Sequence, residues 1–349
     1  MKDLHIKTLV KLGEWFELFA SEKAYPGVSC GLTSEEYDLF LQAKDYAQMG
    51  NAWFTMEQIN TALRGWSESL QEKHVTKWLS AYNLGETNKT LGLITAGNIP
   101  LVGLHDLLTG LVAGYNIKIK LSKDDTFLMR GVIKLLGILN PSVNNRIYEV
   151  VDERLTGFDV IIATGSNNTS RYFDYYFGKY PHIIRKNRHA VAVISESDSK
   201  EDIHALGKDI FTFFGLGCRN VSKVYFPKGY NKDLFFEGLF DYKEIVNHHK
   251  YANNYDYHKA IYLMNQDKIL DNGFLLIKED TALTAPVGVV FYEEYESKEA
   301  ITKTLTENKD QIQCVVGQDY IPFGGAQTPM LWDYADGVDT MKFLVENVG

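Results

Sequence analysis

Short apolar runs that alternate with helical stretches limit most strongly how this chain can fold. The alternation begins near Lys89 and continues almost to the C-terminus. Strands that alternate with helices in this way form a parallel, doubly wound sheet, because each helix carries the chain back across the sheet. We therefore expect an α/β fold. The predicted strands lie within residues 90–98, 116–122, 159–166, 189–195, 215–227, 273–279, 287–295 and 312–317.

The pattern of the sequence changes at Lys89 and, more weakly, near Gly215. Residues 1–88 place apolar side chains at mostly helical spacing with few strand signals, so they predict a helical N-terminal segment. No internal repeat or low-complexity linker separates the parts that follow, so a division near Gly215 rests on this pattern alone. With 349 residues and 45% hydrophobic content, the chain has the length of about two domains.

The charge pattern argues against a nucleic acid or a membrane as a partner. The chain has 36 basic and 45 acidic residues, and neither sign forms a long run. Charges interrupt every apolar stretch near the N-terminus, so we expect no signal sequence, no membrane span and a cytoplasmic location. The histidines at positions 248, 249 and 258 lack a carboxylate or cysteine at ligand spacing, so we predict no metal site.

One cysteine stands in a setting that favours chemistry. Cys30, Cys218 and Cys314 lie far apart and form no Cys-x-x-Cys pair, so neither a disulfide scaffold nor a cysteine zinc site is expected. Cys218 lies in the sequence Gly-Leu-Gly-Cys-Arg-Asn, where the glycines allow close approach to the sulfur and the neighbouring Arg favours the thiolate. An inert core position is the alternative for Cys218, and it is what we expect for the other two.

Two further motifs stand where a predicted strand ends and a helix begins. Residues 97–100, Gly-Asn-Ile-Pro, place the Asn98 amide at the carboxyl edge of the sheet, where such folds bind ligands. Residues 164–166, Thr-Gly-Ser, precede a helix start whose free N–H groups favour an anion such as a dinucleotide phosphate. Ordinary turn and cap chemistry is the alternative for both motifs.

In their order and spacing these segments resemble the aldehyde dehydrogenase superfamily, and within it the LuxC-type acyl-CoA (long-chain fatty acyl) reductases. The resemblance runs from about Thr90 to the C-terminus. Residues 97–100 resemble the superfamily's Asn-containing turn, and Cys218 falls at the nucleophile. The other matching segments are 114–116 with 119–122 ("GN…vvlKps"), 164–166 ("fTGS"), 285–287 ("GPV") and 322–325 ("PFGG").

The resemblance implies a Rossmann-like cofactor domain, an α/β catalytic domain, and a C-terminal segment that returns to the cofactor domain. We expect these parts at residues 89–214, 215–320 and 321–349, with the helical segment 1–88 packed on the cofactor domain. Proteins of this superfamily usually form dimers or tetramers, so we expect a homodimer or homotetramer.

The resemblance also implies the roles of individual residues. Cys218 would be the nucleophile, and the Asn98 amide would hold the oxyanion together with the Cys218 backbone N–H. The residues expected to bind the nicotinamide cofactor are Thr95, Ala96, Gly97, Lys120, Ser122, Lys123, Thr164, Gly165 and Ser166.

Two departures from the superfamily pattern bear on the reaction. The general-base Glu of an "ELGGK" segment has no counterpart in residues 182–186, which read His-Ile-Ile-Arg-Lys, and Ala282 stands in place of a second Glu. Hydrolysis of an acyl-enzyme needs a base that activates water, whereas acyl transfer to or from a thiol does not. We therefore expect reduction of an acyl-CoA or acyl-carrier thioester to the aldehyde. The alternatives are an aldehyde dehydrogenase that forms the acid, and a catalytically silent subunit of the same fold.

Lys123 sets the expectation for the cofactor. In the related enzymes, a Glu three residues after the lysine of the "vvlKps" segment often binds the adenosine ribose hydroxyls and disfavours a 2′-phosphate. Here Lys123 stands at that offset from Lys120. Two ammonium groups near one ribose attract a phosphate, so NADPH is expected in preference to NADH. A solvated residue at a helix start is the alternative for Lys123.

Overall fold

The chain forms two compact units, which we describe separately. The computed structural model describes residues 2–348 apart from 152, 166–171 and 174. Unit 1 consists of Met1–Lys186 and Pro329–Gly349, and unit 2 consists of Asn187–Thr328. The C-terminal part of the chain therefore belongs to the same unit as the N-terminal part.

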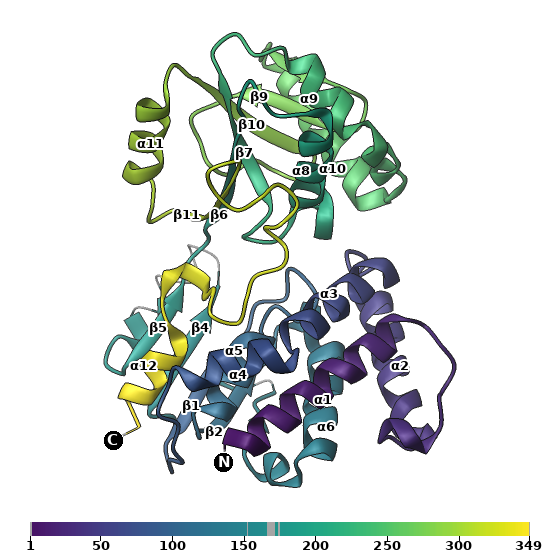
Figure 1. Ribbon diagram of the computed structural model, residues 1–349, viewed down its shortest axis with the longest axis vertical. Helices are drawn as coiled ribbons and strands as arrows, with labels where there is room; N and C mark the ends of the chain where they lie inside the picture. Colours follow the sequence, from purple (N-terminus) through teal and green to yellow (C-terminus); the bar gives the residue numbers. More distant parts are fainter. Residues whose placement is uncertain (1, 152, 166–171, 174, 349) are drawn as a thin grey trace. The chain divides into compact units, whose positions relative to one another are not determined.

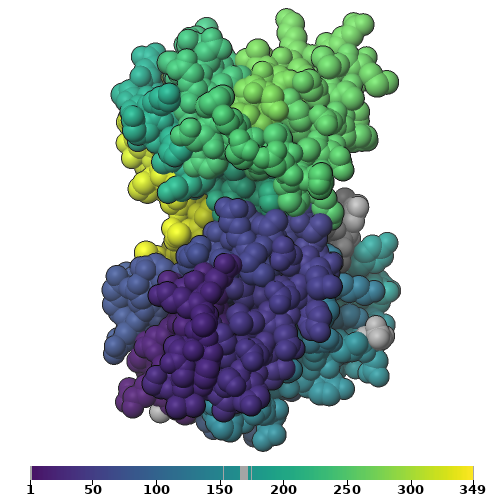
Figure 2. Space-filling view, turned by 90° about the vertical axis from the view of Figure 1, so that its right-hand side faces the viewer, coloured from purple at the N-terminus to yellow at the C-terminus, as the bar shows by residue number. Residues whose placement is uncertain are grey.

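Four helices form the N-terminal part of unit 1 and confirm the predicted helical segment. Thr33 starts the second of them with a capping box, in which its hydroxyl accepts the Glu36 N–H and the Glu36 carboxylate accepts the Thr33 N–H. The first helix packs against the third, and its buried Phe16 and Phe19 rings contact the Phe40 ring of the second. Figure 2 shows that these helices make up a broad face of unit 1. They are α1 (Lys2–Ala20), α2 (Ser34–Gly50), α3 (Met56–Ser69) and α4 (Glu72–Ser80), with a short 3-10 helix η1 (Val28–Cys30).

A five-stranded parallel sheet forms the centre of unit 1, with strand order β3-β2-β1-β4-β5. Chain order reverses between β1 and β4, so the loops after these strands flank the crevice where such folds bind ligands. The strands are β1 (Thr90–Ile94), β2 (Asn116–Lys120), β3 (Ile147–Glu149), β4 (Val160–Thr164) and β5 (His182–Arg185). The helices are α5 (Leu104–Val112), α6 (Thr126–Leu139) and α12 (Thr340–Glu346), and the 3-10 helices are η2 (Lys123–Asp125), η3 (Pro141–Asn145) and η6 (Ala335–Gly337).

Unit 2 is built on a second sheet, with strand order β11-β6-β7-β10-β9-β8, in which only β8 is antiparallel among the described strands. Figure 1 shows α11 on one face of this sheet and α8, α9 and α10 on the other. The strands are β6 (His189–Val193), β7 (Val221–Pro227), β8 (Ile269–Asp271), β9 (Leu276–Glu279), β10 (Val289–Tyr295) and β11 (Ile312–Val316). The helices are α8 (Lys200–Phe211), η4 (Thr212–Gly215), α9 (Lys232–Leu239), η5 (Phe240–Asn247), α10 (His249–Met264) and α11 (Lys298–Glu307).

The boundary between the units differs from the one that the sequence pattern indicated. The chain crosses from unit 1 to unit 2 after Lys186 and returns after Thr328, whereas the sequence placed the divisions near Gly215 and at residue 321. The reason is β6, whose apolar run fits either sheet. It pairs with β7 and β11 rather than with the strands of unit 1. Among the described helices, none is both long enough and apolar enough to cross a membrane.

A buried ion pair closes unit 1 where the chain leaves it. Arg185, at the end of β5, donates to the Asp106 carboxylate of α5 at 2.6 and 3.2 Å. The same guanidinium donates to the Ala335 carbonyl and the Thr340 hydroxyl, both at 2.9 Å. Both charged side chains are nearly inaccessible to solvent. Arg185 therefore joins the sheet, α5 and the returning C-terminal segment.

We predict that Asp106→Asn lowers the free energy of unfolding by about 3 kcal/mol, because it removes the hydrogen-bonded carboxylate from the buried Arg185 and leaves only the longer ion pair with Asp336, at 3.9 Å, to balance the charge. Denaturant unfolding measures this change. Glu149→Gln is the matched control, since Glu149 binds Arg130 in an ion pair that is partly exposed to solvent, and its loss should cost less than about 1 kcal/mol. Equal costs for the two variants would show that burial of the pair does not matter.

Candidate functional site

The loop after β1 carries Asn98 at the carboxyl edge of the sheet in unit 1. The sequence predicted a helix from Pro100, but α5 begins at Leu104, because Leu101 has a left-handed backbone with φ of 59°. Residues 95–103 therefore form a separate turn between strand and helix. The Asn98 side chain lies on the solvent-exposed side of this turn.

Hydrogen bonds and close packing join this turn to the loop after β2. The Ser122 N–H donates to the Thr95 hydroxyl at 3.1 Å, and the Thr95 N–H donates to the Lys120 carbonyl at 3.1 Å. Gly97 packs so tightly that a Cβ built there would lie 2.5 Å from the Ser122 hydroxyl oxygen. Five of the predicted cofactor residues, at positions 95–97, 120 and 122, are thus neighbours in the structure.

Asp125 lies beneath this turn, and the sequence reasoning missed it. Its carboxylate accepts the Leu101 N–H at 2.7 Å and is almost fully buried. Burial raises the pKa of Asp125 well above its ordinary value. Its second oxygen, Oδ1, has no hydrogen-bond partner among the residues that the structure describes. The carboxyl holds the left-handed turn that follows Asn98, a role that depends on a contact between two loops and has no local sequence signal.

The two lysines expected near the cofactor differ in their surroundings. The Lys120 ammonium donates to the Glu153 carbonyl at 2.7 Å, whereas the Lys123 side chain is exposed in η2. Thr164 ends β4 and Gly165 follows it, and both are half-buried at the same sheet edge. Ser166 lies outside the described residues. Among the described residues, no cluster of three His, Cys, Asp or Glu side chains is placed to bind a metal.

Cys218 belongs to unit 2 and lies exposed in the turn between α8 and β7. Three consecutive residues before it, Phe213, Phe214 and Gly215, have positive φ values of 52°, 56° and 78°. Bulky side chains rarely adopt this left-handed conformation, and strain of this kind collects at functional sites. The Phe214 ring stacks on the His248 ring at a centroid distance of 4.2 Å. Aromatic packing thus accompanies the strained backbone.

The buried Asn220 side chain fixes the turn that carries Cys218. Its carbonyl oxygen accepts the Gly217 N–H at 2.8 Å. Its amide donates to the carbonyls of Thr212 at 2.8 Å and Asp209 at 3.0 Å, both near the end of α8. One side chain therefore ties the start of the turn to the end of the helix before it. In the sequence, Asn220 stands out only as a neighbour of the cysteine, because its partners at the end of α8 become close only in the folded chain.

Asp209 is fully buried near the end of α8 and binds the segment that contains residues 322–325. Its two carboxylate oxygens accept the N–H groups of Gly324 at 2.6 Å and Ala326 at 2.9 Å. Burial raises the pKa of Asp209 to about 6, although these two hydrogen bonds and the positive charge of Arg219 favour the ionised form. The sequence gives no sign of this carboxylate, because its partners lie more than a hundred residues away.

Comparisons of sequence find no relatives, whereas comparison of structure finds many. No family model matches the chain, and no curated protein matches it. Aldehyde dehydrogenase 21 from Physcomitrella patens, solved with the reaction product succinate, is 12% identical, with 97% of this chain and 84% of that chain covered and a TM-score of 0.64. The NAD+ complex of an aldehyde dehydrogenase from Bacillus cereus is 13% identical over 90% of this chain and 71% of that one, with a TM-score of 0.61.

A double mutant of betaine aldehyde dehydrogenase from Staphylococcus aureus, in complex with NAD+, is 12% identical, with 90% of this chain and 72% of that chain covered and a TM-score of 0.62. This chain has the aldehyde dehydrogenase fold. The likeness confirms the predicted α/β architecture with its helical N-terminal segment. At this identity it establishes the fold alone, so the LuxC-type resemblance stays a prediction.

In this aldehyde dehydrogenase fold, the two positions that depart from the superfamily pattern have defined surroundings. Residues 182–185 form β5, and Arg185 is engaged in the buried ion pair with Asp106. Ala282 is exposed, and its N–H donates to the Asp280 carboxylate at 3.0 Å. That bond and the ion pair with Lys278 lower the pKa of Asp280. Asp280 is therefore held as a charged turn residue.

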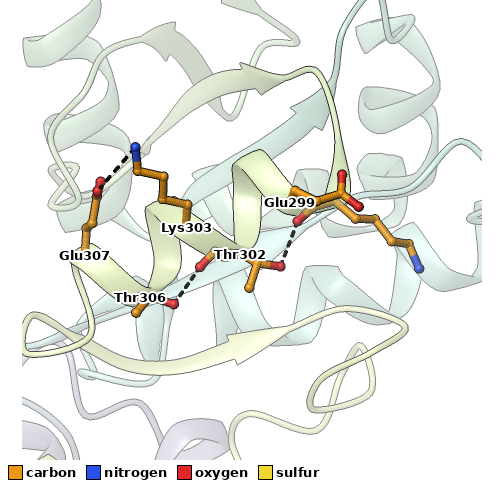
Figure 3. Close-up of a pocket in the computed structure, with 6 residues that line it drawn as sticks. Glu299, Thr302, Lys303, Thr306 and Glu307 are labelled. Carbon is orange, nitrogen blue, oxygen red and sulfur yellow. Dashed lines mark hydrogen bonds and ion pairs between the residues drawn. The ribbon is translucent and has the colours of Figure 1, made fainter.

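A hollow on the surface of unit 2 is lined by the single helix α11 (Figure 3). The hydroxyls of Thr302 and Thr306 donate to carbonyls one turn earlier in the same helix, at 2.7 Å. Lys303 and Glu307 form an ion pair along the helix at 3.8 Å. Because these polar groups are engaged within the helix, the hollow has no converging set of groups for a ligand.

We predict a pH dependence of stability that comes from Asp209. Its pKa is about 6 in the folded chain against 3.8 for the free group, so between these values the folded chain binds more protons than the unfolded chain. The stabilisation is complete below the lower pKa and is lost as the pH rises through about 6, by at most about 1.4 kcal/mol per pH unit. The difference in unfolding free energy between wild type and Asp209→Asn should be larger near pH 4 than near pH 7. A difference that does not change with pH, measured by denaturant unfolding, contradicts the shift.

Proposed function

We propose that this chain reduces an acyl-CoA thioester, most simply a fatty acyl-CoA, to the aldehyde with NADPH, through an acyl-enzyme on Cys218. One observation carries the proposal. In an aldehyde dehydrogenase fold, the exposed Cys218 lies in a strained and tightly bonded turn, while residues 182–186 and position 282 contain no carboxylate. A cysteine that can hold an acyl group without a base for water favours transfer of that group to hydride or thiol.

The residues of unit 1 fit a nicotinamide dinucleotide. The parallel strand order with a switch between β1 and β4 is the arrangement that binds dinucleotides in related sheets, and two of the structural neighbours are NAD+ complexes. Residues 95–97, Lys120, Ser122, Lys123 and residues 164–166 would hold the cofactor. When bound in its reduced form, it supplies the hydride that the reaction consumes.

Cys218 and Asn98 would carry the chemistry of the acyl group. The Cys218 thiolate, favoured by the adjacent Arg219, attacks the thioester carbon, and the carbon–sulfur bond to CoA breaks as the CoA thiolate leaves. The Asn98 amide and the Cys218 N–H donate to the oxyanion that forms at each tetrahedral stage. After hydride addition, the bond to the Cys218 sulfur breaks, the aldehyde leaves, and the thiolate is restored.

The expected surroundings of the protein are part of the same proposal. The acyl donor is CoA or an acyl-carrier protein, and the protein acts in the cytoplasm as a homodimer or homotetramer, as the resemblance implies. The alternatives are oxidation of an aldehyde to the free acid, which the names of the structural neighbours suggest for those proteins, and a silent subunit. The fate of the acyl-enzyme separates the first alternative from the proposal, and turnover of any kind excludes the second.

We predict that, when the protein oxidises an aldehyde, the acyl-enzyme persists until a thiol accepts the acyl group. Supplied with a fatty aldehyde, oxidised cofactor and CoA, the protein should form acyl-CoA continuously. Without CoA it should stall after about one turnover per active site, because general-base assistance to water, worth about 10² to 10⁴ in rate, is missing. Reduced cofactor is followed by absorbance, and the product is identified by mass spectrometry.

Cys218→Ala is the control for this experiment, and it should form neither product nor labelled protein with radioactive acyl-CoA. Cys314→Ala is the matched variant, since Cys314 is a buried residue of β11, and it should keep the label on Cys218. Continuous release of free carboxylic acid in the absence of CoA would sink the thioester reductase proposal. Label on Cys30 or Cys314 would sink the assignment of the nucleophile.

We predict a preference for NADPH that depends on Lys123. Lys123→Glu should lower kcat/KM with NADPH and favour NADH, because an exposed ammonium that attracts the 2′-phosphate is replaced by a carboxylate that repels it. Lys134→Glu, at an exposed position of the following helix α6, controls for the change in net charge. Equal efficiency of the two cofactors in the wild type, or unchanged selectivity in Lys123→Glu, rules the preference out.

A further inference from the structure

The segment with the sequence Pro-Phe-Gly-Gly, residues 322–325, has no part in the proposed chemistry, yet it packs against α8. Gly324 has φ of 84°, and a Cβ there would approach the Ala205 carbonyl of α8 to 3.2 Å. Glycine is therefore required for the backbone to lie this close to the helix. The segment is held next to the helix whose C-terminal end leads into the turn of Cys218.

A buried charge holds this segment. The Asp209 carboxylate receives the N–H groups of Gly324 and Ala326 and is inaccessible to solvent. The charged and titratable groups that interact with it are Arg219, Lys208 and Tyr242. A buried carboxylate stays ionised only where such donors and cations compensate it, so the two N–H groups are required partners rather than incidental ones.

Hydrogen bonds continue from this segment to the turn of Cys218. Arg219 donates through Nε to the Ala326 carbonyl, and its own carbonyl accepts the Gln327 amide at 3.0 Å. Asn220 donates to the Asp209 carbonyl and accepts the Gly217 N–H. The bonds form a closed circuit from Asp209 through residues 324–327 to the turn at 217–220 and back to α8.

We propose that Asp209 is a positioning residue for Cys218. Its carboxylate fixes residues 324–327, which hold Arg219, while its backbone carbonyl accepts the Asn220 amide. Arg219 and Asn220 are the two residues that follow Cys218. The proposal rests on Cys218 being the nucleophile, but the physical coupling that it states is measurable without any substrate.

Hydrogen exchange followed by mass spectrometry on the full-length chain tests the coupling. The Asp209→Asn side chain has one acceptor oxygen, whereas the N–H groups of Gly324 and Ala326 each need one. Amide hydrogens in peptides covering 322–328 and 213–220 should therefore both exchange about fivefold faster. Asp202→Asn is the matched control, because Asp202 also accepts a backbone N–H on α8 but at the opposite end of the helix. It should leave both peptides unchanged.

Faster exchange in peptide 322–328 alone would show that Asp209 stabilises only that segment, and this would overturn the proposal. Unchanged exchange in both peptides would overturn it as well. If Asp209→Asn does not fold, Gln327→Met replaces it, since that change removes the donor to the Arg219 carbonyl and keeps Asp209. Faster exchange in peptide 213–220 is then expected, and unchanged exchange there overturns the proposal.

Steady-state kinetics adds a second readout. Asp209→Asn should lower kcat about tenfold and leave the KM for NADPH unchanged, because the proposed cofactor residues belong to unit 1. If the wild type is an active reductase and Asp209→Asn has the same kcat, the positioning role is overturned, even where both peptides exchange faster. Absence of reductase activity in the wild type counts against the proposed function, and the exchange experiment then decides the coupling alone.

Discussion

The ion pair between Arg185 and Asp106 holds unit 1 together at the place where the chain would otherwise come apart. The chain leaves this unit directly after Lys186 and returns at Pro329. Arg185 binds α5 through Asp106, and it binds the returning segment through the Ala335 carbonyl and the Thr340 hydroxyl. The planar guanidinium of Arg185 can donate to three acceptors at once. It therefore joins the end of β5, where the chain leaves the unit, to the C-terminal segment that returns to it. The ion pair thus lies where the chain leaves unit 1 to form the second sheet.

The position of the missing general base is separate from this ion pair. By the resemblance drawn from the sequence, the glutamate that opens the superfamily's segment corresponds to His182, the first residue of β5. His182 is exposed, with a ring nitrogen 2.8 Å from the Tyr180 carbonyl, whereas Arg185, at the other end of β5, forms the buried ion pair. The proposed loss of hydrolytic chemistry and the closing of unit 1 therefore involve different residues of the same strand.

The sequence predicted what depends on local pattern. Strand and helix alternation, the turn at residues 97–100 and the glycine before Cys218 all leave a signal within a few residues, and the structure places positions 95–97, 120 and 122 next to one another. The roles of three residues could not be predicted, because each acts through a partner that is close only in the folded chain. They are Asp125, Asp209 and Asn220. The boundary between units was misplaced for a related reason: the apolar run of β6 fits any parallel sheet, and only pairing with β7 and β11 decides which.

The left-handed run at Phe213, Phe214 and Gly215 places strained backbone shortly before Cys218. Each non-glycine residue in this conformation raises the energy of the folded backbone by about 1–2 kcal/mol, and the stacking of Phe214 on His248 opposes its release. Any relaxation of the backbone must first pull an aromatic ring out of its packing. The backbone that leads to Cys218 is therefore held by aromatic packing as well as by the hydrogen bonds of Asn220.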